Sequence, residues 1–363
     1  MPHSNACSSS ILIAPAPPTS LAISSEEAVR SSLESFRRDV LQGLSQSKRQ
    51  LPCKYFYDRR GSLLFDQICE LPEYYPTRTE AGIMADNVDA IARRIGSDAV
   101  IVEYGSGSST KTRLLLDHLV QPHAYVPVDI SREHLLQTAN KLREDYPHID
   151  IHPVVADFTA PFSLPHPFRR TIKRRTGGSD ALHSESSPGV ASDSASCNTV
   201  YFPGSTIGNL EPDAAVVLLQ SIADQCQPGG GLLIGFDLKK NPDILQAAYD
   251  DSQGVTAQFN LNLLHRMNRE LDAEVDVDQF RHVAVYNDAM SRIEIYIESC
   301  IDQSVRIENS TFQFDAGDRI LTEYSHKYDI ETFTSMAELA GLVPDEVWTD
   351  ADDYFAIMHL SAR

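Results

Sequence analysis

Between Ala99 and Leu238, short apolar runs alternate with amphipathic segments of helical spacing. The runs predict strands with turns, and they lie at 99–108, 124–131, 149–158, 199–210 and 230–238. The segments between them predict helices, and they lie at 110–120, 132–146 and 212–226. Strands that alternate with helices favour a parallel sheet covered on both faces. The sequence therefore predicts an α/β fold.

The pattern changes after Lys240, where helical segments lead into consecutive strand-like segments. The helical segments lie at 242–251 and 255–271, and the strand-like ones at 280–287, 291–299, 303–308 and 310–314. Consecutive strands favour antiparallel pairing, so we expect a second, α+β domain inserted into the first. A helix at 330–342 and a strand at 354–362 then return to the sheet. We expect the sheet domain to comprise 81–239 and 329–363. We expect the inserted domain to comprise 21–80 and 240–328.

Two segments lack any apolar periodicity. Residues 1–20 are rich in Ser, Pro and Ala and are expected to form a disordered tail. Residues 165–198 are rich in Ser and Gly and are expected to form a mobile loop. The basic cluster RRTIKRR in this loop could bind nucleic acid, but it has no interleaved aromatic residues. We therefore favour a solvated loop.

Composition limits the partners of this chain. The formal net charge is -20, and such a surface repels phosphate backbones, so we expect no nucleic acid partner. No apolar run approaches the roughly 20 residues that a membrane span needs, so we expect no membrane association. The six cysteines form no CxxC pair and no zinc-like spacing with histidine, which predicts no metal site. Reduced thiols favour a cytoplasmic protein, and we expect a monomer with a small-molecule substrate.

The segment VEYGSGSSTKTRLLL, at 102–116, is a strand that breaks into a glycine turn and restarts as a helix. This arrangement is typical of a nucleotide or anion site. The turn, with Gly105 and Gly107, lacks the third glycine of a dinucleotide site and the spacing of a phosphate-binding P-loop. Its shorter E-x-G-x-G form is typical of S-adenosylmethionine sites, in which the backbone meets the amino acid end of the cofactor.

Two acids end the next strands of the series. Asp129 could accept both ribose hydroxyls, while Asp157 could take the adenine amino group with Phe158 against the ring. Each acid alone could instead be a helix cap or a turn residue. At three successive strand ends, however, the glycine turn and the two acids would line one crevice.

The end of the fourth strand, FPGSTIGNL at 202–210, lies where substrates reach the cofactor in such sheets. Asn209 offers amide donors and an acceptor, and Gly204 lets the backbone approach a ligand. A plain strand-to-helix turn is the structural alternative.

Seven motifs occur in an order that resembles one enzyme family. They are KYFYDRRGSLLFDQICELPEYYPTRTE, VEYGSGSSTKT, VPVDIS, VADF, FPGSTIGNL, GVTAQFNLNLLHRMNREL and TEYSHKY. Together they resemble the L-histidine N-alpha-methyltransferase family of ergothioneine biosynthesis, over about 51–355 except the Ser-rich loop. The resemblance implies trimethylation of the α-amine of histidine to hercynine, with S-adenosylmethionine as cofactor. It also implies a Rossmann-like class I methyltransferase domain and a second domain that closes the substrate pocket.

The resemblance also implies site residues. The implied cofactor positions are Tyr57, Gly105, Lys111, Asp129, Asp157 and Phe158. The implied histidine positions are Tyr74, Gly204, Asn209, Tyr249, Glu323 and Ser325. In the family, the residues matching Tyr249 and Asn209 hold the carboxylate and amine, and those matching Glu323 and Ser325 hold the imidazole. We take Asn209 and Tyr57 as the candidate catalytic residues. Glu323 and Ser325 alternate along TEYSHKY, so both side chains are expected on one face of a strand.

Two departures and three rivals stay open at this point. Ser205 stands where the family often has a second glycine, and Ile295 stands where it often has Met beside the imidazole. The nearest rival is a methyltransferase for another amino acid, such as a prenylated tryptophan, which would have less use for Glu323. The others are a nicotinamide-dependent oxidoreductase, against which the missing GxGxxG weighs, and a non-catalytic cofactor-binding module.

Overall fold

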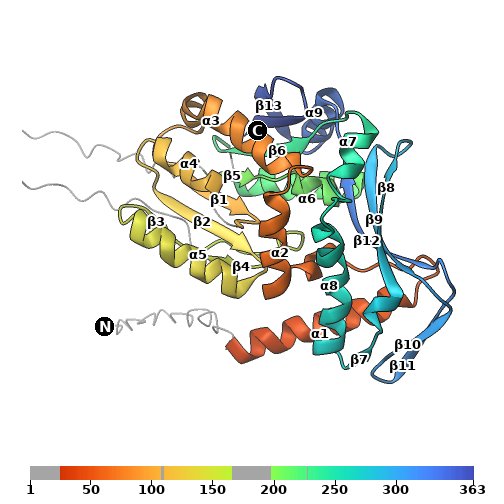
Figure 1. Cartoon of the computed structure of the whole chain (residues 1–363). Helices are drawn as coiled ribbons and strands as arrows, with labels where there is room; N and C mark the ends of the chain where they lie inside the picture. Colours follow the sequence, from red (N-terminus) through yellow and green to blue (C-terminus); the bar gives the residue numbers. More distant parts are fainter. Residues whose placement is uncertain (1–24, 108–109, 166–197, 227) are drawn as a thin grey trace, which may run out of the picture.

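A computed structural model describes residues 25–107, 110–165, 198–226 and 228–363 (Figure 1). The predicted tail at 1–20 lies outside the described residues, and so does the predicted loop at 165–198 apart from its first and last residues.

The described chain is built around an eight-stranded sheet (Figure 1). Its strands, in spatial order, are β13 (Leu342–Thr349), β14 (Phe355–Ala362), β6 (Gly231–Asp237), β5 (Asn198–Phe202), β1 (Val100–Tyr104), β2 (Ala124–Asp129) and β3 (Asp150–Ile151), with β4 (Val154–Val155) also paired to β2. The pairings from β6 through β5, β1 and β2 to β3 and β4 are all parallel. The strand β14 pairs antiparallel with β6, and β13 pairs antiparallel with β14. The predicted α/β fold with a parallel sheet is confirmed.

Helices cover both faces of the sheet because successive side chains of each buried strand point to opposite sides. On one face, Ile101 and Tyr201 pack with α3 (Tyr75–Ile95), α4 (Thr110–His118) and α5 (Arg132–Asp145). On the other face, Val102 and Val200 pack with α6 (Pro212–Cys226) and α9 (Ile330–Leu339). This double cover explains why the strands are apolar along their whole length.

Three element predictions needed correction. The single strand expected at 149–158 is split into β3 and β4, because Pro153 between them has no N–H to give to the ladder. The strand β13 was not predicted, since it is an edge strand with a mixed polar sequence and an irregularity between Pro344 and Glu346. The apolar spacing of 81–95 predicts a helix over those residues, but the helix already begins at Tyr75, where Pro76 in the first turn costs no helical hydrogen bond.

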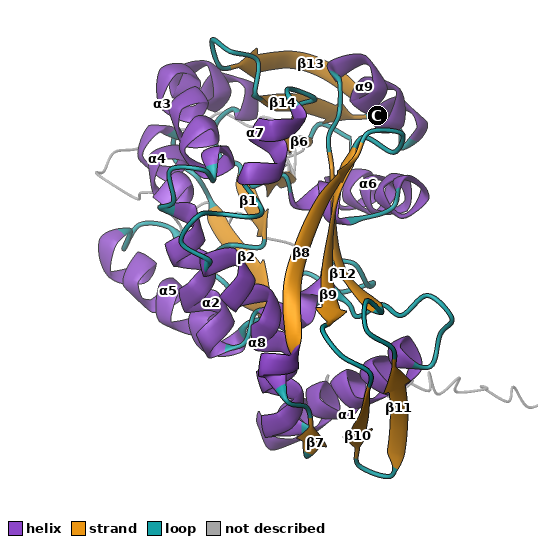
Figure 2. Cartoon of the chain, turned by 45° about the vertical axis from the view of Figure 1, so that its right-hand side comes forward, coloured by secondary structure: helices purple, strands orange, loops and turns teal. Residues whose placement is uncertain are grey.

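A second region packs beside the carboxyl ends of the parallel strands (Figure 2). It holds two antiparallel sheets, one of β12 (Arg319–His326), β9 (Arg292–Ser299) and β8 (Phe280–Asn287), and one of β11 (Ser310–Phe314), β10 (Gln303–Ile307) and β7 (Ala273–Glu274). Its helical elements are α1 (Ser25–Leu44), η1 (Cys53–Phe56), α2 (Arg59–Cys69), α7 (Pro242–Ala247), α8 (Val255–Glu270) and η3 (Val277–Gln279). Their buried side chains form a separate apolar core, drawn from 36–75 and 245–320.

This second core joins two segments that are distant in the sequence, with the parallel strands of the sheet between them. The chain thus brings η1 and β12 close to the sheet edge where β1, β2, β4 and β5 end. None of the helices in the described ranges is both long and apolar enough to cross a membrane.

Candidate functional site

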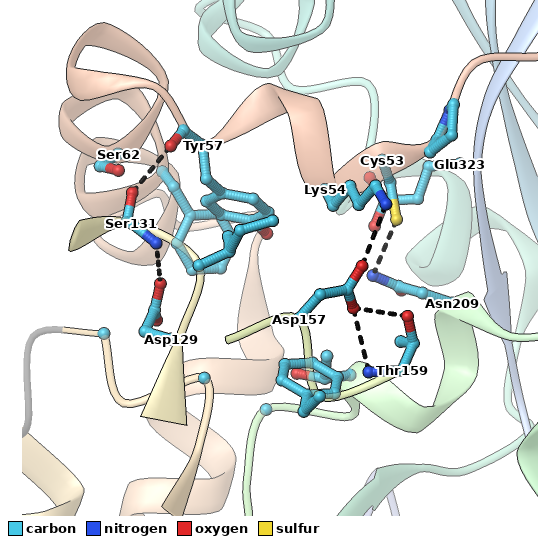
Figure 3. A pocket seen from close by; sticks show the side chains of 18 of the residues that line it. Cys53, Lys54, Tyr57, Ser62, Asp129, Ser131, Asp157, Thr159, Asn209 and Glu323 are labelled. Atoms are coloured by element: carbon cyan, nitrogen blue, oxygen red, sulfur yellow. Dashed lines mark hydrogen bonds and ion pairs between the residues drawn. The ribbon is translucent and has the colours of Figure 1, made fainter. Parts of the chain in front are cut away.

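A cavity of about 840 Å³ lies between the carboxyl edge of the sheet and the second region. The sheet contributes the residues at the ends of β1, β2, β4 and β5, which meet at one edge because these strands are parallel. The second region contributes η1 and β12 as the facing wall (Figure 3). Ten of the twelve predicted site residues line this cavity: Tyr57, Tyr74, Gly105, Lys111, Asp129, Asp157, Phe158, Gly204, Asn209 and Glu323.

The glycine turn after β1 has the conformation that its sequence suggested. Gly105 has φ +72° and Gly107 has φ +39°, both in the left-handed region that favours glycine. A Cβ added at Gly105 would come no closer than 3.9 Å to the Phe158 ring, so conformation rather than space requires the glycine. The turn therefore leaves bare backbone facing the cavity.

The acid of the E-x-G-x-G motif, Glu103, lines the cavity at the end of β1. Its Oε2 accepts hydrogen bonds from Thr112 Oγ1 at 2.6 Å and Tyr125 Oη at 2.5 Å. Burial raises the pKa of this carboxyl to about 7. The sequence analysis quoted this residue without assigning it a role.

Lys111, at the start of α4, lines the cavity and is paired with the buried carboxylate of Glu80 on α3. Glu80 also accepts the backbone N–H of Gly204, at 3.0 and 3.1 Å to its two oxygens. Glu80, which the sequence analysis missed, therefore ties a predicted cofactor residue to a predicted substrate residue. Gly204 itself has φ +79°, which favours glycine at that position.

Asp129 ends β2 at the cavity, and its Oδ1 accepts the N–H of Ser131 at 2.7 Å (Figure 3). Burial raises the pKa of this carboxyl above its usual range. The hydroxyl of Ser131 donates to the carbonyl of Tyr57 at 2.8 Å, which joins η1 to the end of β2.

Asp157 follows β4, and its two oxygens have different partners (Figure 3). Oδ1 accepts from the N–H and hydroxyl of Thr159 at 3.0 and 2.5 Å, and Oδ2 accepts from Lys54 Nζ at 3.0 Å. Burial opposes the charge on Asp157, but these hydrogen bonds and Lys54 together hold its pKa below the usual range. The neighbouring Phe158 ring stacks on Tyr104, with centroids 5.3 Å apart and planes at 16°.

Cys53 and Glu323 of the facing wall point toward Asn209, which follows β5 (Figure 3). Asn209, at the end of η2 (Thr206–Asn209), has its Nδ2 3.9 Å from Cys53 Sγ. Burial raises the pKa of Glu323 to about 7, against the opposing effects of the Lys327 charge and the Asn209 amide. This carboxylate therefore faces the cavity in an environment that favours a donor ligand.

The tyrosines of the cavity are kept in the neutral form. Burial raises the pKa of the Tyr57 and Tyr74 phenols well above their usual value, and the charge of Glu323 raises them further. Tyr74 stands edge-on to Tyr249, with ring centroids 5.9 Å apart and planes at 78°. These phenols can donate hydrogen bonds but are poor proton acceptors.

The two remaining predicted residues, Tyr249 and Ser325, are not among the side chains that line this cavity in the described chain. Both are buried, and their hydroxyls lie 2.7 Å apart. Lys327, which the sequence analysis did not single out, donates to both of them. The pair adjoins the wall through Tyr74 and through Glu323, two residues before Ser325 on β12.

The two departures noted in the sequence have structural answers. Ser205 has φ 57°, the left-handed conformation that a glycine would take easily, and its hydroxyl accepts the N–H of Asp237 at 3.0 Å. Ile295 is buried in β9 opposite Glu323 and takes part in the second core. Within the described ranges, no group of three His, Cys, Asp or Glu side chains is placed to hold a metal ion.

Comparison with known proteins adds independent findings. A profile of the family described as histidine-specific, SAM-dependent methyltransferases matches residues 36–362. The chain is 39% identical over 343 residues to a histidine N-alpha-methyltransferase of Mycolicibacterium smegmatis, covering 93% of this chain and 98% of that protein. It is also 39% identical over 327 residues to the histidine N-alpha-methyltransferase of Mycobacterium tuberculosis, covering 88% and 93%. The ergothioneine biosynthesis protein 1 of Neurospora crassa is 29% identical over 321 residues, which are 87% of this chain and 33% of that protein.

Proposed function

Because the chain belongs to the family of histidine-specific, S-adenosylmethionine-dependent methyltransferases, we propose that it methylates the α-amine of L-histidine three times. The product is hercynine, the betaine of histidine, and the reaction is a step of ergothioneine biosynthesis. The observation that carries this proposal is the cavity itself, in which a glycine turn and two strand-end acids face Asn209 and Glu323.

The residues at the sheet edge fit S-adenosylmethionine. The bare backbone at Gly105 suits the amino acid end of the cofactor, and Asp129 at the end of β2 suits the ribose hydroxyls. Asp157 keeps acceptor capacity for the adenine amino group, and Phe158 offers a ring face to the adenine. Lys111, held by Glu80, is assigned to the carboxylate of the cofactor.

The facing wall fits an amino acid with an imidazole side chain. A partly buried carboxylate such as Glu323 is stabilised by a donor, and an imidazole N–H supplies one. Asn209 can accept from the amine and donate to the carboxylate of the same substrate. The hydroxyls of Tyr249 and Ser325 are assigned to the carboxylate and the imidazole, and Tyr74 to contact with the ring.

Bound S-adenosylmethionine supplies a methyl group activated by its sulfonium. The chain itself has to hold the amine in its neutral form, with its lone pair aimed at that methyl group, so its contribution is mainly positioning and electrostatics. Asn209 orients the amine, and Tyr57 offers a neutral phenol beside it. The ring faces of Tyr57 and Tyr74 suit the permanent cation that the third transfer leaves.

We further propose that the protein acts as a monomer in the cytoplasm. The cysteines in the described ranges, Cys53, Cys69, Cys226 and Cys300, are free thiols, which supports a reducing compartment.

Release of S-adenosylhomocysteine by the purified protein, measured with a panel of amino acids, tests the proposed function. Turnover with L-histidine, and little or none with tryptophan or its prenylated derivative, is the expected result. Faster turnover with an indole substrate would favour the rival amino acid methyltransferase, and no turnover with any amino acid would refute the proposal.

A further inference from the structure

A buried charge cluster lies where β6 meets the end of β12 and the start of α3. We call the side chains of Asp237, Lys240, Lys327 and Tyr75 the Asp237 cluster. The Asp237 carboxylate accepts from Tyr75 Oη at 2.7 and 2.8 Å, from Lys240 Nζ at 2.6 Å and from Lys327 Nζ at 2.7 Å. Two ammonium groups therefore share one carboxylate, and the cluster carries a net positive charge.

Lys327 uses its whole donor capacity inside the protein. Its side chain is 0% exposed, and its Nζ lies 2.7 Å from Asp237 Oδ2, 2.7 Å from Ser325 Oγ and 3.0 Å from Tyr249 Oη. An ammonium group has three donors and no acceptor capacity, so these three contacts satisfy it. Burial alone would lower the pKa of Lys327, but Asp237 raises it above the usual range. Lys327 thus stays charged at neutral pH.

This arrangement limits the directions in which the hydroxyls of Tyr249 and Ser325 can donate hydrogen bonds. Because Lys327 can only donate, both oxygens accept from it, and neither hydroxyl proton points at the ammonium group. The oxygens lie 2.7 Å apart, so one hydroxyl donates to the other. One of the two hydroxyl protons is then left with no acceptor among the described residues.

We infer that Lys327 is a positioning residue for the amino acid substrate, holding Tyr249 and Ser325 so that their spare proton is donated to an acceptor atom of the substrate. The inference rests on the proposed function. The two hydroxyls adjoin the cavity wall at Tyr74 and Glu323, and a histidine bound against that wall offers two such acceptors, its carboxylate and the unprotonated nitrogen of a neutral imidazole. A hydroxyl polarised by a buried ammonium group is a stronger donor than a free one.

Lys240 provides a matched control within the same cluster. It binds the same carboxylate and also donates to Tyr75, but no contact joins it to Tyr249 or Ser325 in the described chain. Its side chain is 5% exposed, so its loss removes a similar buried charge. A merely structural role for the cluster would make the two lysines equivalent.

The test is calorimetric binding of L-histidine to the full chain in the presence of S-adenosylhomocysteine. For Lys327→Met we expect the Kd for histidine to rise about tenfold or more, with the affinity for S-adenosylhomocysteine unchanged. Lys240→Met should raise the histidine Kd far less. Equal effects of the two changes on the histidine Kd would overturn the inference.

Histidinol, which lacks the carboxylate, identifies the acceptor. If Lys327→Met weakens the binding of histidine but not that of histidinol, the spare proton is donated to the carboxylate. If it weakens the binding of both ligands alike, the proton is donated to the imidazole. If Lys327→Met weakens the binding of neither ligand more than Lys240→Met does, the inference is contradicted.

A double-mutant cycle separates positioning from folding. In a Tyr249→Phe, Ser325→Ala background, Lys327→Met should have little further effect on the histidine Kd, because the hydroxyls through which it acts are gone. If Lys327→Met does not fold, as judged by thermal unfolding, Lys327→Gln replaces it, since glutamine keeps donors without the charge. A wild-type protein that neither binds nor methylates histidine would refute the proposed function itself, an outcome distinct from failure of the Lys327 inference.

Discussion

Lys54 on η1 donates to Asp157 at the carboxyl edge of the sheet, with Nζ 3.0 Å from Oδ2 (Figure 3). The residue before it, Cys53, contacts Asn209, which follows β5. A single short element of the second region therefore touches both the predicted cofactor side and the predicted substrate side.

Lys54→Met should weaken binding of S-adenosylmethionine. The change leaves the Asp157 carboxylate without its cation and loosens η1 from the edge of the sheet. Both groups are partly exposed, at 33% and 25%, so we expect a modest effect of about three- to tenfold on the cofactor Kd, measured by calorimetry.

Lys239→Met is the matched control for this change, because Lys239 forms a more exposed pair with Asp329, which is not among the cavity-lining residues. Its cofactor Kd should stay at the wild-type value. An equal loss in both variants would mean that the pairing of Lys54 with Asp157 has no specific part in cofactor binding.

Asn209→Ala should sharply lower turnover of histidine. The amide stands at the substrate end of the cavity, and its loss removes the group that orients the amine. We expect kcat/KM for histidine to fall by about 100-fold, while the Kd for S-adenosylmethionine changes little. Near wild-type turnover in a methylation assay would rule out that role.

Glu323→Leu should relax the choice of amino acid. An apolar side chain cannot accept the imidazole N–H, so KM for histidine should rise about tenfold or more while cofactor binding is spared. Competition between histidine and other aromatic amino acids measures the effect. Unchanged discrimination in the variant would show that Glu323 does not recognise the imidazole.

Glu323 should also make the ligand-free protein less stable at higher pH. Its pKa is about 7 in the folded chain, whereas an unperturbed glutamate has 4.5. Between these pH values the folded chain therefore binds more protons than the unfolded chain. The free energy of unfolding therefore falls as pH rises from 4.5 to 7, and the penalty is fully present above that window. Glu323→Gln should accordingly stabilise the protein at pH values above 7, by at most about 3 kcal/mol, with the gain vanishing toward the acid end.

Urea unfolding of wild type and variant across this pH range measures the difference. Glu338→Gln, at an exposed position on α9, serves as the control and should show no such trend. A gain from Glu323→Gln that did not change with pH would contradict the assigned titration.

The sheet was predictable because its evidence is local. Alternating apolar runs and amphipathic segments carry their own periodicity, and the carboxyl ends of parallel strands must meet at one edge. That rule was enough to bring Gly105, Asp129 and Asp157 together. The edge strand β13 was not predicted because polar residues interrupt its apolar ones and it has a neighbour on one side only.

The polar partners of the site were not predictable in the same way. The partner of Lys54 is 103 residues away in the sequence, and the hydroxyl of Tyr249 lies 78 residues from Lys327. No periodicity marks such pairs, since they arise only when segments distant in the sequence pack against each other. The roles of the site residues and the domain boundaries stay predictions.

Analysis of the reaction product tests the central claim most directly. Purified protein is incubated with L-histidine and S-adenosylmethionine labelled in its methyl group, and the product is analysed by mass spectrometry and NMR. The account predicts a histidine that carries three labelled methyl groups, all on the α-nitrogen. Labelled methyl groups on the imidazole, or a histidine recovered without any label, would contradict it.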